Sequence, residues 1–394
     1  MTPRGSDGAR SLEQLLAAKE ILISCGSGGV GKTTSAAAAG AMAAAVLGGR
    51  VLVLTVDPAR RLANALGLQG LGNVEKPVPP EMFREAGVEP RGELFAAMLD
   101  TKQSWDALVQ RHAPDQATAR RILDNPLYKN VSGRFVQSHD YIAMERLYEL
   151  HTTGDYDLIV VDTPPTRNAI DFLEAPANMA DFFSSRFLRL LTVPARSRVV
   201  NFATRPFYTI ADRILGSQFL EDIAEFFLLF QTMYAGFVER ARAVEHLLHD
   251  RRTTFMVVTT LEAAPLREAE FFIDALHRQK FHLGALVLNR VLPSYLCDTA
   301  ATRVAEKLVA EPEQMARALG DGCGDGAHAA RVLHSVGESF LNFQVVAKRE
   351  QEERAELEDV PDVVVTVPYF ETDIYDLEGL LRAGRAMWGE PPNP

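Results

Sequence analysis

Cysteine, positive charge and long apolar runs are all scarce in this chain of 394 residues. Its three cysteines lie far apart and form no CxxC pair, which argues against a disulfide framework and against a zinc site formed by neighbouring residues. The 41 lysines and arginines are outnumbered by 52 acidic residues, so the formal net charge is −11. Broad binding of nucleic acid through a basic surface is therefore not expected.

The longest run of small apolar residues, 35–49, is rich in alanine and glycine. It is shorter than the ~20 apolar residues that a helix needs to span a bilayer. The first residues of the chain also lack the basic and then apolar pattern of a signal peptide. These observations predict a cytoplasmic protein with no stable membrane insertion.

Short apolar runs alternate with longer helical patterns along most of the chain. This alternation predicts an α/β fold with a mostly parallel β-sheet flanked by helices. Ligands of such sheets bind beyond the carboxyl ends of the strands, so the polar residues that follow each run are candidate site residues. Seven strands are expected, at residues 20–25, 51–56, 93–99, 157–162, 254–260, 283–289 and 362–367.

The alternation fails between the fourth and fifth expected strands. Residues 175–250 contain no clear strand, and apolar side chains recur there every three to four residues, which is typical of helices. We expect a single domain over residues 1–394, with a helical subdomain formed by residues 102–152 and 175–250. Loops are predicted at residues 70–83 and 319–329, and a flexible tail at residues 389–394.

A phosphate-binding loop is predicted directly after the first strand. The stretch 26-GSGGVGKTT-34 satisfies the pattern G-x4-G-K-[ST] and stands between an apolar strand and an alanine-rich helix. Glycines let the backbone N–H groups face phosphate oxygens, and the N-terminus of the helix adds partial positive charge. Lys32 would reach the β- and γ-phosphates, and the hydroxyl of Thr33 would hold Mg²⁺. The loop residues predicted to bind ATP are Gly26, Gly28, Gly29, Val30, Gly31, Lys32, Thr33 and Thr34.

Two of the other expected strands lead directly to an aspartate. Asp162 ends the fourth strand and suits the shell of a bound Mg²⁺, with a helix-capping role as the alternative. Asp57 follows the second strand and could orient or deprotonate a water that attacks the γ-phosphate. A simple turn formed by Asp57 and Pro58 is the alternative, and the spacing alone leaves both open.

In this order the three motifs resemble those of the ArsA family of ATPases. The family's phosphate loop reads GKGGVGKT, its first switch DPAHNLSDAF and its second switch DTAPTGHTLRFL. The corresponding stretches here are 26-GSGGVGKTT-34, 57-DPARRLANAL-66 and 162-DTPPTRNAIDFL-173. Residues 363–381 also resemble the C-terminal part of the family, so the resemblance covers nearly the whole chain. The family includes arsenite-pump ATPases and ATPases that deliver tail-anchored membrane proteins.

The resemblance implies a P-loop NTPase fold that uses ATP and Mg²⁺, with Lys32 and Asp57 as the catalytic residues. Asp162 becomes the residue of the second switch that holds Mg²⁺, directly or through water. Asn289 matches an asparagine that contacts adenine in the family, although it could also cap its strand.

The resemblance also implies a dimer that closes when nucleotide binds. The helical lobe after the second switch is where the targeting relatives hold an apolar client helix. Packing within the lobe itself is the alternative, and the sequence slightly favours it. Candidate groove residues are Phe182, Phe183, Phe187, Leu188, Phe226 and Phe230.

Position 27 departs from the family. Ser27 stands where the relatives carry a lysine that crosses the dimer interface toward the phosphates of the partner. Closure could be weaker here, another cation could substitute, or a paralogous ATPase that keeps the lysine could form a heterodimer instead of a homodimer. Candidate cations are Arg60, Arg61 and Arg167.

The cysteines also depart from the family. The CxxC pair that clamps some of the targeting dimers is missing, and an arsenite site needs clustered thiols. A site built from Cys297 and Cys323 would need an unexpected convergence of the two, and Cys25 is expected to be a core residue.

Four functional classes fit these observations to different degrees. The leading hypothesis is an ATP-hydrolysing dimeric switch that handles a protein partner, and the second is a nucleotide-regulated scaffold with weak hydrolysis. A DNA-partitioning or division-site ATPase is less favoured, because such chains usually have a lysine at position 27 and a basic or membrane-binding surface. A small-molecule kinase or ligase ranks lowest, because it would leave the first switch and the long helical insertion unexplained.

Overall fold

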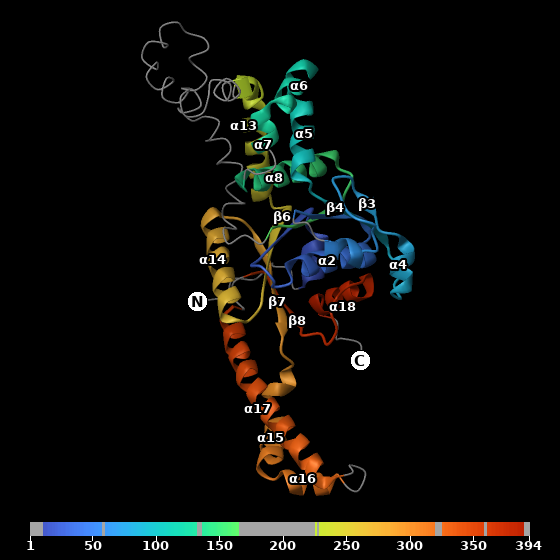
Figure 1. Ribbon diagram of the computed structural model, residues 1–394, viewed down its shortest axis with the longest axis vertical. Coiled ribbons are helices and arrows are strands. Elements are labelled where there is room, and N and C mark those ends of the chain that lie inside the picture. The colour runs from blue at the N-terminus through green and yellow to red at the C-terminus, as the bar shows by residue number, and fades with distance from the viewer. Residues whose placement is uncertain are drawn as a thin grey trace, which may run out of the picture.

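An eight-stranded β-sheet forms the centre of the protein, with helices on both faces (Figure 1). The computed structural model describes residues 11–56, 60–131, 136–164, 225–226, 228–319, 325–357 and 361–389. The strands lie in the order β3-β4-β2-β5-β1-β6-β7-β8, and among them only β3 pairs antiparallel to its neighbour. Their bounds are β1 Ile21–Cys25, β2 Gly49–Thr55, β3 Lys76–Pro77, β4 Gly92–Met98, β5 Leu158–Asp162, β6 Thr253–Thr259, β7 Leu283–Val291 and β8 Val363–Pro368.

The structure confirms the α/β fold with its mostly parallel sheet, and all seven expected strands are present within two residues of their predicted bounds. The predicted loop at 70–83 was wrong in part, because it contains the short strand β3 and the start of helix α4 (Pro80–Glu85). Proline fits the first turn of a helix, whose N–H groups have no partner within the helix. Phe83 then anchors α4 by burying its ring against the core.

Successive residues of the strands pack alternately into two separate hydrophobic cores, one on each face of the sheet. Ile21 and Ile23 face one core, whereas Leu22 between them faces the other. Helices α1 (Leu12–Ala17), α2 (Lys32–Met42) and α18 (Leu377–Met387) pack on the face of Leu22, together with a short π-helical turn η1 (Ala43–Leu47). Helix α14 (Ala263–Gln279) covers the opposite face. Because residues 36–41 of α2 are all alanine or glycine, this helix lies close to both the sheet and α18.

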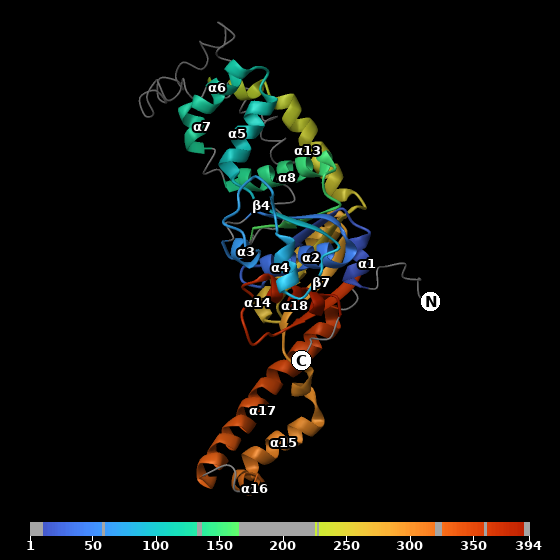
Figure 2. The ribbon, with the colours of Figure 1, turned by 90° about the vertical axis from the view of Figure 1, so that its right-hand side faces the viewer.

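A helical lobe stands at the β4 side of the sheet (Figure 2). It contains α5 (Thr101–His112), α6 (Gln116–Asp124), α7 (Pro126–Val131), α8 (Val136–Thr153) and α13 (Tyr234–His249). Aromatic rings fill its centre, with Trp105 6.2 Å from Phe237 and 6.1 Å from Tyr141 between ring centroids. Residues 102–152 are therefore largely helical, as expected. Their grouping with 175–250 into one subdomain stays a prediction, because residues 165–224 lie outside the described part of the chain, as do residues 390–394 of the tail.

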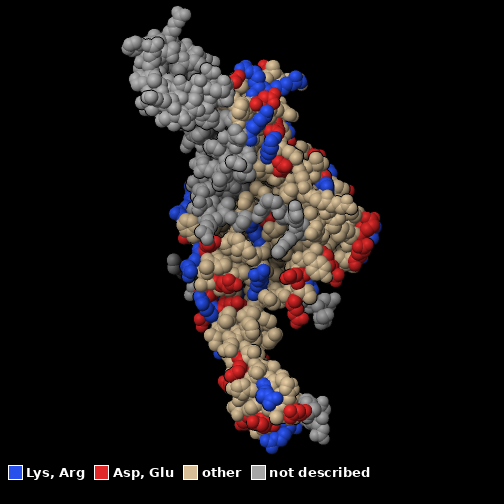
Figure 3. Space-filling view, viewed as in Figure 1, with Lys and Arg blue, Asp and Glu red and all other residues tan. Residues whose placement is uncertain are grey.

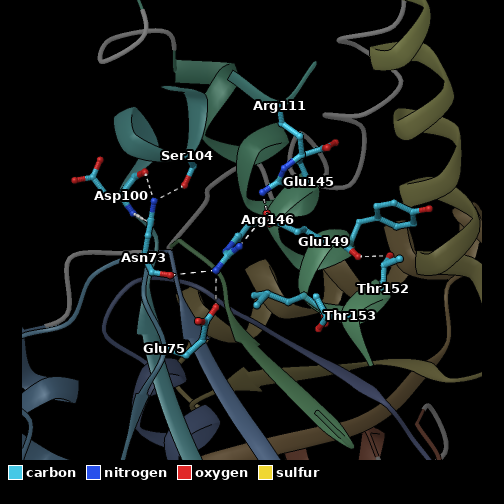
Figure 4. Close-up of polar contacts among 12 residues, drawn as sticks. Asn73, Glu75, Asp100, Ser104, Arg111, Glu145, Arg146, Glu149, Thr152 and Thr153 are labelled. Carbon is cyan, nitrogen blue, oxygen red and sulfur yellow. Dashed lines mark hydrogen bonds and ion pairs between the residues drawn. The ribbon is translucent and has the colours of Figure 1, made fainter. Parts of the chain in front are cut away.

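Charged contacts attach the lobe to the edge of the sheet (Figure 4). Arg146 of α8 donates through Nη2 to the backbone oxygen of Asn73, 3.1 Å away, and pairs with Glu75 beside β3. Its Nη1 lies 2.9 Å from Glu149 Oε2 on the same helix. The amide nitrogen of Asn73 in turn donates to Ser104 Oγ of α5, at 2.9 Å. Arg146 thus joins the loop before β3 to α8, and Asn73 joins the same loop to α5.

A second projection, which we name the arm, extends from the β7–β8 side of the sheet, away from the lobe (Figures 1 and 2). It contains a 3₁₀ turn η2 (Ser294–Cys297), α15 (Thr299–Ala310), α16 (Pro312–Ala318) and α17 (Gly326–Leu357). The 32 residues of α17 make a helix of ~48 Å. The predicted C-terminal bound of the loop at 319–329 was wrong, because α17 already begins at Gly326. Within the described residues, no helix is both long and apolar enough to cross a membrane.

Candidate nucleotide site

The loop between β1 and α2 has the backbone geometry that a phosphate-binding loop needs. Gly29 and Gly31 have φ angles of +83° and +92°, in the left-handed region that favours glycine. Gly31 directly precedes Lys32, the first residue of α2, and no side chain of the described residues caps this helix. The free N–H groups of its first turn are therefore open to an anion at the carboxyl edge of the sheet.

Asn289, near the end of β7, braces this loop from the side. Its amide nitrogen donates to the backbone oxygen of Val30 at 2.7 Å, and its side-chain oxygen accepts from the N–H of Arg290 at 2.9 Å. Arg290 itself has a left-handed φ of 59°, which is unusual for a non-glycine residue. The structure thus places Asn289 against the phosphate loop, while its predicted contact with adenine stays a prediction.

The contact of Asn289 with the phosphate loop predicts how glycine substitutions change the free energy of unfolding in the absence of nucleotide. A Cβ atom on Gly31 would lie 2.2 Å from Nδ2 of Asn289, whereas a Cβ on Gly29 would meet nothing within 4 Å. We expect Gly29→Ala to cost ~1–2 kcal/mol of unfolding free energy through its backbone conformation alone. Gly31→Ala should cost at least ~1 kcal/mol more, because the asparagine must move as well. Urea unfolding of both variants measures the difference.

The same experiment has an internal control. Adding Asn289→Ala to Gly31→Ala removes the clashing amide, so the extra cost of Gly31→Ala over Gly29→Ala should largely vanish in the double variant. Equal losses for the two single glycine variants would contradict the brace.

Asp162, at the end of β5, is the centre of the site. One of its carboxylate oxygens, Oδ2, accepts from Thr33 Oγ1 at 2.7 Å and from Thr55 Oγ1 at 3.0 Å. The other oxygen, Oδ1, lies 3.6 Å from Lys32 Nζ, and the same ammonium donates to the backbone oxygen of Thr163. The phosphate loop and the start of the second switch are therefore in direct contact. The roles predicted for Lys32 at the phosphates and for Thr33 and Asp162 at Mg²⁺ stay predictions.

Sequence reasoning missed Thr55. The sequence feature that could have identified Thr55 is its position as the last residue of β2. The parallel pairing of β2 with β5 places Thr55 opposite Asp162. Residues at the same register position of neighbouring parallel strands end at the same edge, so a hydroxyl there can reach the carboxylate.

Burial shapes the charge of this cluster. The side chain of Asp162 is fully buried, and this desolvation raises the pKa of its carboxyl group, while Lys32 and the two hydroxyls oppose the shift. Oδ1 accepts no hydrogen bond from the described residues, although it is shielded from solvent. Mg²⁺ prefers oxygen ligands. Asp162 Oδ1, which lacks a hydrogen-bond partner among those residues, and the nearby hydroxyl of Thr33 are ligands of this kind.

Comparison with known proteins agrees with this geometry. The model of the family described as anion-transporting ATPase, the ArsA family, matches residues 19–315, from the strand before the phosphate loop into the arm. The chain belongs to this family. Membership in a family of ATPases supports nucleotide binding at the loop just described.

Individual relatives of this ATPase are distant but cover much of it. A protein of Aquifex aeolicus (strain VF5) described as an arsenical pump-driving ATPase is 24% identical over 388 residues, which cover 94% of this chain and 79% of that protein. The ATPase ASNA1 homolog 1 of Paramecium tetraurelia is 27% identical over 274 residues, which cover 68% of this chain and 73% of that protein.

Several predicted site residues of this ATPase lie outside the described residues. They include Asp57, the candidate water-activating residue, although helix α3 (Arg60–Ala65) begins three positions later. The candidate cations Arg60 and Arg61 are therefore the first residues of α3. The others outside the described residues are Arg167, Phe182, Phe183, Phe187 and Leu188.

Phe226 and Phe230, the two candidate groove residues that are described, are both buried in the lobe. Their ring centroids are 4.7 Å apart, and Phe230 stacks on Phe237 at 5.6 Å. In this structure they pack as core, which was the alternative that the sequence slightly favoured. Their role in a client groove stays a prediction.

The cysteines offer no thiol cluster within the described residues. Cys25 is buried beneath the phosphate loop, and burial raises the pKa of its thiol to about 12. Cys297 is half-buried in η2, and Cys323 lies outside the described residues. No group of three or more His, Cys, Asp or Glu side chains in the described part of the chain could hold a metal ion.

Proposed function

We propose that this chain is an ATP-hydrolysing switch that works as a dimer and handles a protein partner, with an apolar helix as the class of client. The observation that carries the proposal is the contact of Lys32 and Thr33 with Asp162. A loop that binds phosphate and a switch that responds to it are joined through one buried carboxylate. A change at the phosphates can therefore move the chain after Asp162, which leads into the lobe.

Thr33 and Asp162 are the residues that would hold Mg²⁺ with ATP bound. The ion supplies neutralisation of the charge on the β- and γ-phosphates. Lys32 adds a second positive charge near the same phosphates, and the N–H groups of the first turn of α2 hold the phosphate oxygens. Asp57 is proposed to orient and deprotonate the attacking water.

The lobe is the proposed place for the client. Its described helices bury a large aromatic cluster, and residues 165–224 connect the second switch to this cluster. We propose that a client helix docked on the lobe affects the nucleotide site through the chain that joins Asp162 to the lobe in sequence. Tail-anchored proteins, which relatives in this family deliver, have such an apolar helix.

Single-turnover hydrolysis of ATP tests this function. We expect phosphate release that requires Mg²⁺, a shift toward dimer in sedimentation velocity when a non-hydrolysable ATP analogue is added, and a change in rate of at least about threefold on adding a lysine-flanked apolar peptide of ~20 residues. A polar helical peptide of equal length is the matched control.

A scaffold with weak hydrolysis is the second candidate, and Ser27 is the residue that favours it. Its side chain has no charge to stabilise a partner's phosphates, and its hydroxyl is buried without a hydrogen-bond partner among the described residues. Tight ATP binding and ATP-dependent dimers without turnover would support the scaffold and exclude the switch.

A further inference from the structure

The outer face of α17 in the arm carries an uncovered apolar stripe. Val332, Val336, Phe343 and Val346 are 48%, 52%, 55% and 48% exposed. Their spacing of four, seven and three residues brings them to one side of the helix, with Ser339 between them. We name these five residues the arm stripe.

The arm does not need the arm stripe for its own packing. The other side of α17 packs on α15 and α16, and it buries small or amide side chains there. A Cβ atom on Gly337 would lie 2.8 Å from the backbone oxygen of Ala305, so the two helices are in close contact. Gln344 joins α17 to η2 by donating a hydrogen bond to the backbone oxygen of Leu296 at 3.0 Å. The exposed valines and phenylalanine therefore have another role.

Charge is nearly missing along this part of the helix. Between Arg331 and Lys348, α17 carries one acidic side chain, Glu338, and no lysine or arginine. Charged side chains lie near the tip of the arm, where α17 begins, and mostly uncharged surface follows toward the body in the view of Figure 3. Solvated helix faces are rich in charge, whereas the cores of protein interfaces are poor in it. This composition indicates that the arm stripe is covered in the assembled protein.

The spacing of the arm stripe is nearly symmetric about Ser339. Val332 and Val346 each lie seven positions from Ser339, and Val336 and Phe343 lie three and four positions from it. A two-fold axis through Ser339 places Val332 of one chain beside Val346 of another, and Val336 beside Phe343. Two-fold interfaces require a surface that complements itself, and the arm stripe meets that condition. We propose that it binds the arm stripe of a second copy of this chain, with the two helices antiparallel.

The available area fits a weak, reversible association. The exposed parts of the four apolar residues amount to on the order of 400 Å² per chain, about half of the ~800 Å² per partner in a standard interface. Polar side chains that flank the stripe would add the remainder when two long helices lie side by side.

This contact differs from the nucleotide-gated dimer of the proposed function. The arm projects away from the body of the protein, so an antiparallel pair of arms keeps the two bodies at opposite ends (Figures 1 and 2). The phosphate loops stay free, and self-association through the arm requires no ATP. Failure of either proposal leaves the other intact.

Sedimentation velocity without nucleotide, over a range of protein concentrations, tests this proposal. The wild-type chain should dimerise reversibly, and the variant Val336→Glu/Phe343→Glu should raise the dissociation constant at least about a hundredfold, because it buries unpaired carboxylates. Val345→Glu is the matched control. Val345 is 71% exposed but lies two residues beyond Phe343, about 200° around the helix, so this variant should dimerise as the wild type does.

Circular dichroism and ATP binding check that all variants remain folded. A wild-type chain that stays monomeric over the whole range overturns the proposal, including the case in which the stripe binds a helix of a different protein. Equal loss of dimer in the Val345→Glu control overturns it as well.

Disulfide cross-linking tests the antiparallel arrangement, in a background where Cys297 and Cys323 are serine. Mixing chains that carry Val336→Cys with chains that carry Phe343→Cys should give a covalent dimer of the two, at least about fivefold more than Val336→Cys alone. Efficient cross-linking of Val336→Cys with itself would show a parallel pair and overturn the proposed geometry.

Discussion

Replacing Lys32 with alanine is expected to reduce single-turnover hydrolysis of ATP at least about a thousandfold. Phosphoryl transfer depends mostly on positioning and on stabilising the charge that develops on the phosphate oxygens. Lys32 is the positive side chain of the phosphate loop, and its ammonium already lies beside Asp162 and the backbone of Thr163. Phosphate release at saturating Mg²⁺ and ATP is the measurement.

The same substitution should change how stability depends on pH. Among the described residues, Lys32 is the cation paired with the buried Asp162, whose pKa is already raised, and its loss raises that pKa further. A carboxyl group with a folded-state pKa above its unfolded value binds more protons in the folded state, so stability falls as the pH rises through the range between the two values. The Lys32→Ala variant should therefore gain more stability than the wild type between neutral pH and about pH 5, measured by urea unfolding.

Two controls separate charge from misfolding. The double variant Lys32→Ala/Asp162→Asn removes both buried charges, so it should recover most of the stability lost at neutral pH but none of the hydrolysis. Lys348→Ala on the exposed arm should leave hydrolysis unchanged. Turnover of Lys32→Ala within tenfold of the wild-type rate would exclude the proposed role of this lysine.

The sheet and the phosphate loop could be predicted because both depend on local patterns. Continuous apolar runs of five to seven residues are typical of buried parallel strands, and each of these runs became a strand. The loop motif fixes Gly31, Lys32 and Thr33 through backbone geometry that only a few residue types allow. Asp162 followed from its place at a strand end, without knowledge of any contact.

The missed features depend on contacts between distant segments. Thr55 contacts Asp162 because β2 and β5 are neighbours, although 107 positions separate the two residues. Strand β3 is two residues long and contains a proline, so it has no periodic signal, and its pairing with β4 decides its structure. The arm was missed for a different reason. Apolar residues between Val332 and Ala347 lie on more than one face of α17, so the sequence does not show which face is exposed, whereas the structure does.

Ser27 links the nucleotide site to the question of assembly. Its hydroxyl is buried without a hydrogen-bond partner among the described residues, so the structure shows no substitute interaction at position 27. If the chain hydrolyses ATP efficiently, the cation that acts on the phosphates must come from a different residue or from a different subunit. A variant that binds ATP but hydrolyses it slowly would trap the assembly in which that cation is in place.

Asp57→Asn is the variant expected to have this property. It should reduce hydrolysis at least about a hundredfold, which is within the range for loss of a general base, and leave ATP affinity within about threefold of the wild type. The N–H of Val56, the residue before it in the sequence, donates to the backbone oxygen of Asp162 at 3.0 Å, so Val56 lies beside the proposed Mg²⁺ site. Single-turnover hydrolysis and equilibrium binding of a fluorescent ATP analogue measure the two effects.

Asp100 is the matched control for this prediction, because it also follows a parallel strand of the same sheet. Its carboxylate accepts from the N–H of Gln103 at 2.9 Å and caps α5. Asp100→Asn should therefore cost about 1 kcal/mol of stability or less and leave hydrolysis unchanged. If Asp57→Asn turns over ATP normally, Asp57 is a turn residue before Pro58 and the water is activated by another group. If it is slow, affinity capture with bound ATP should recover the closed dimer, and a paralogous ATPase in that dimer would supply the charge that Ser27 lacks.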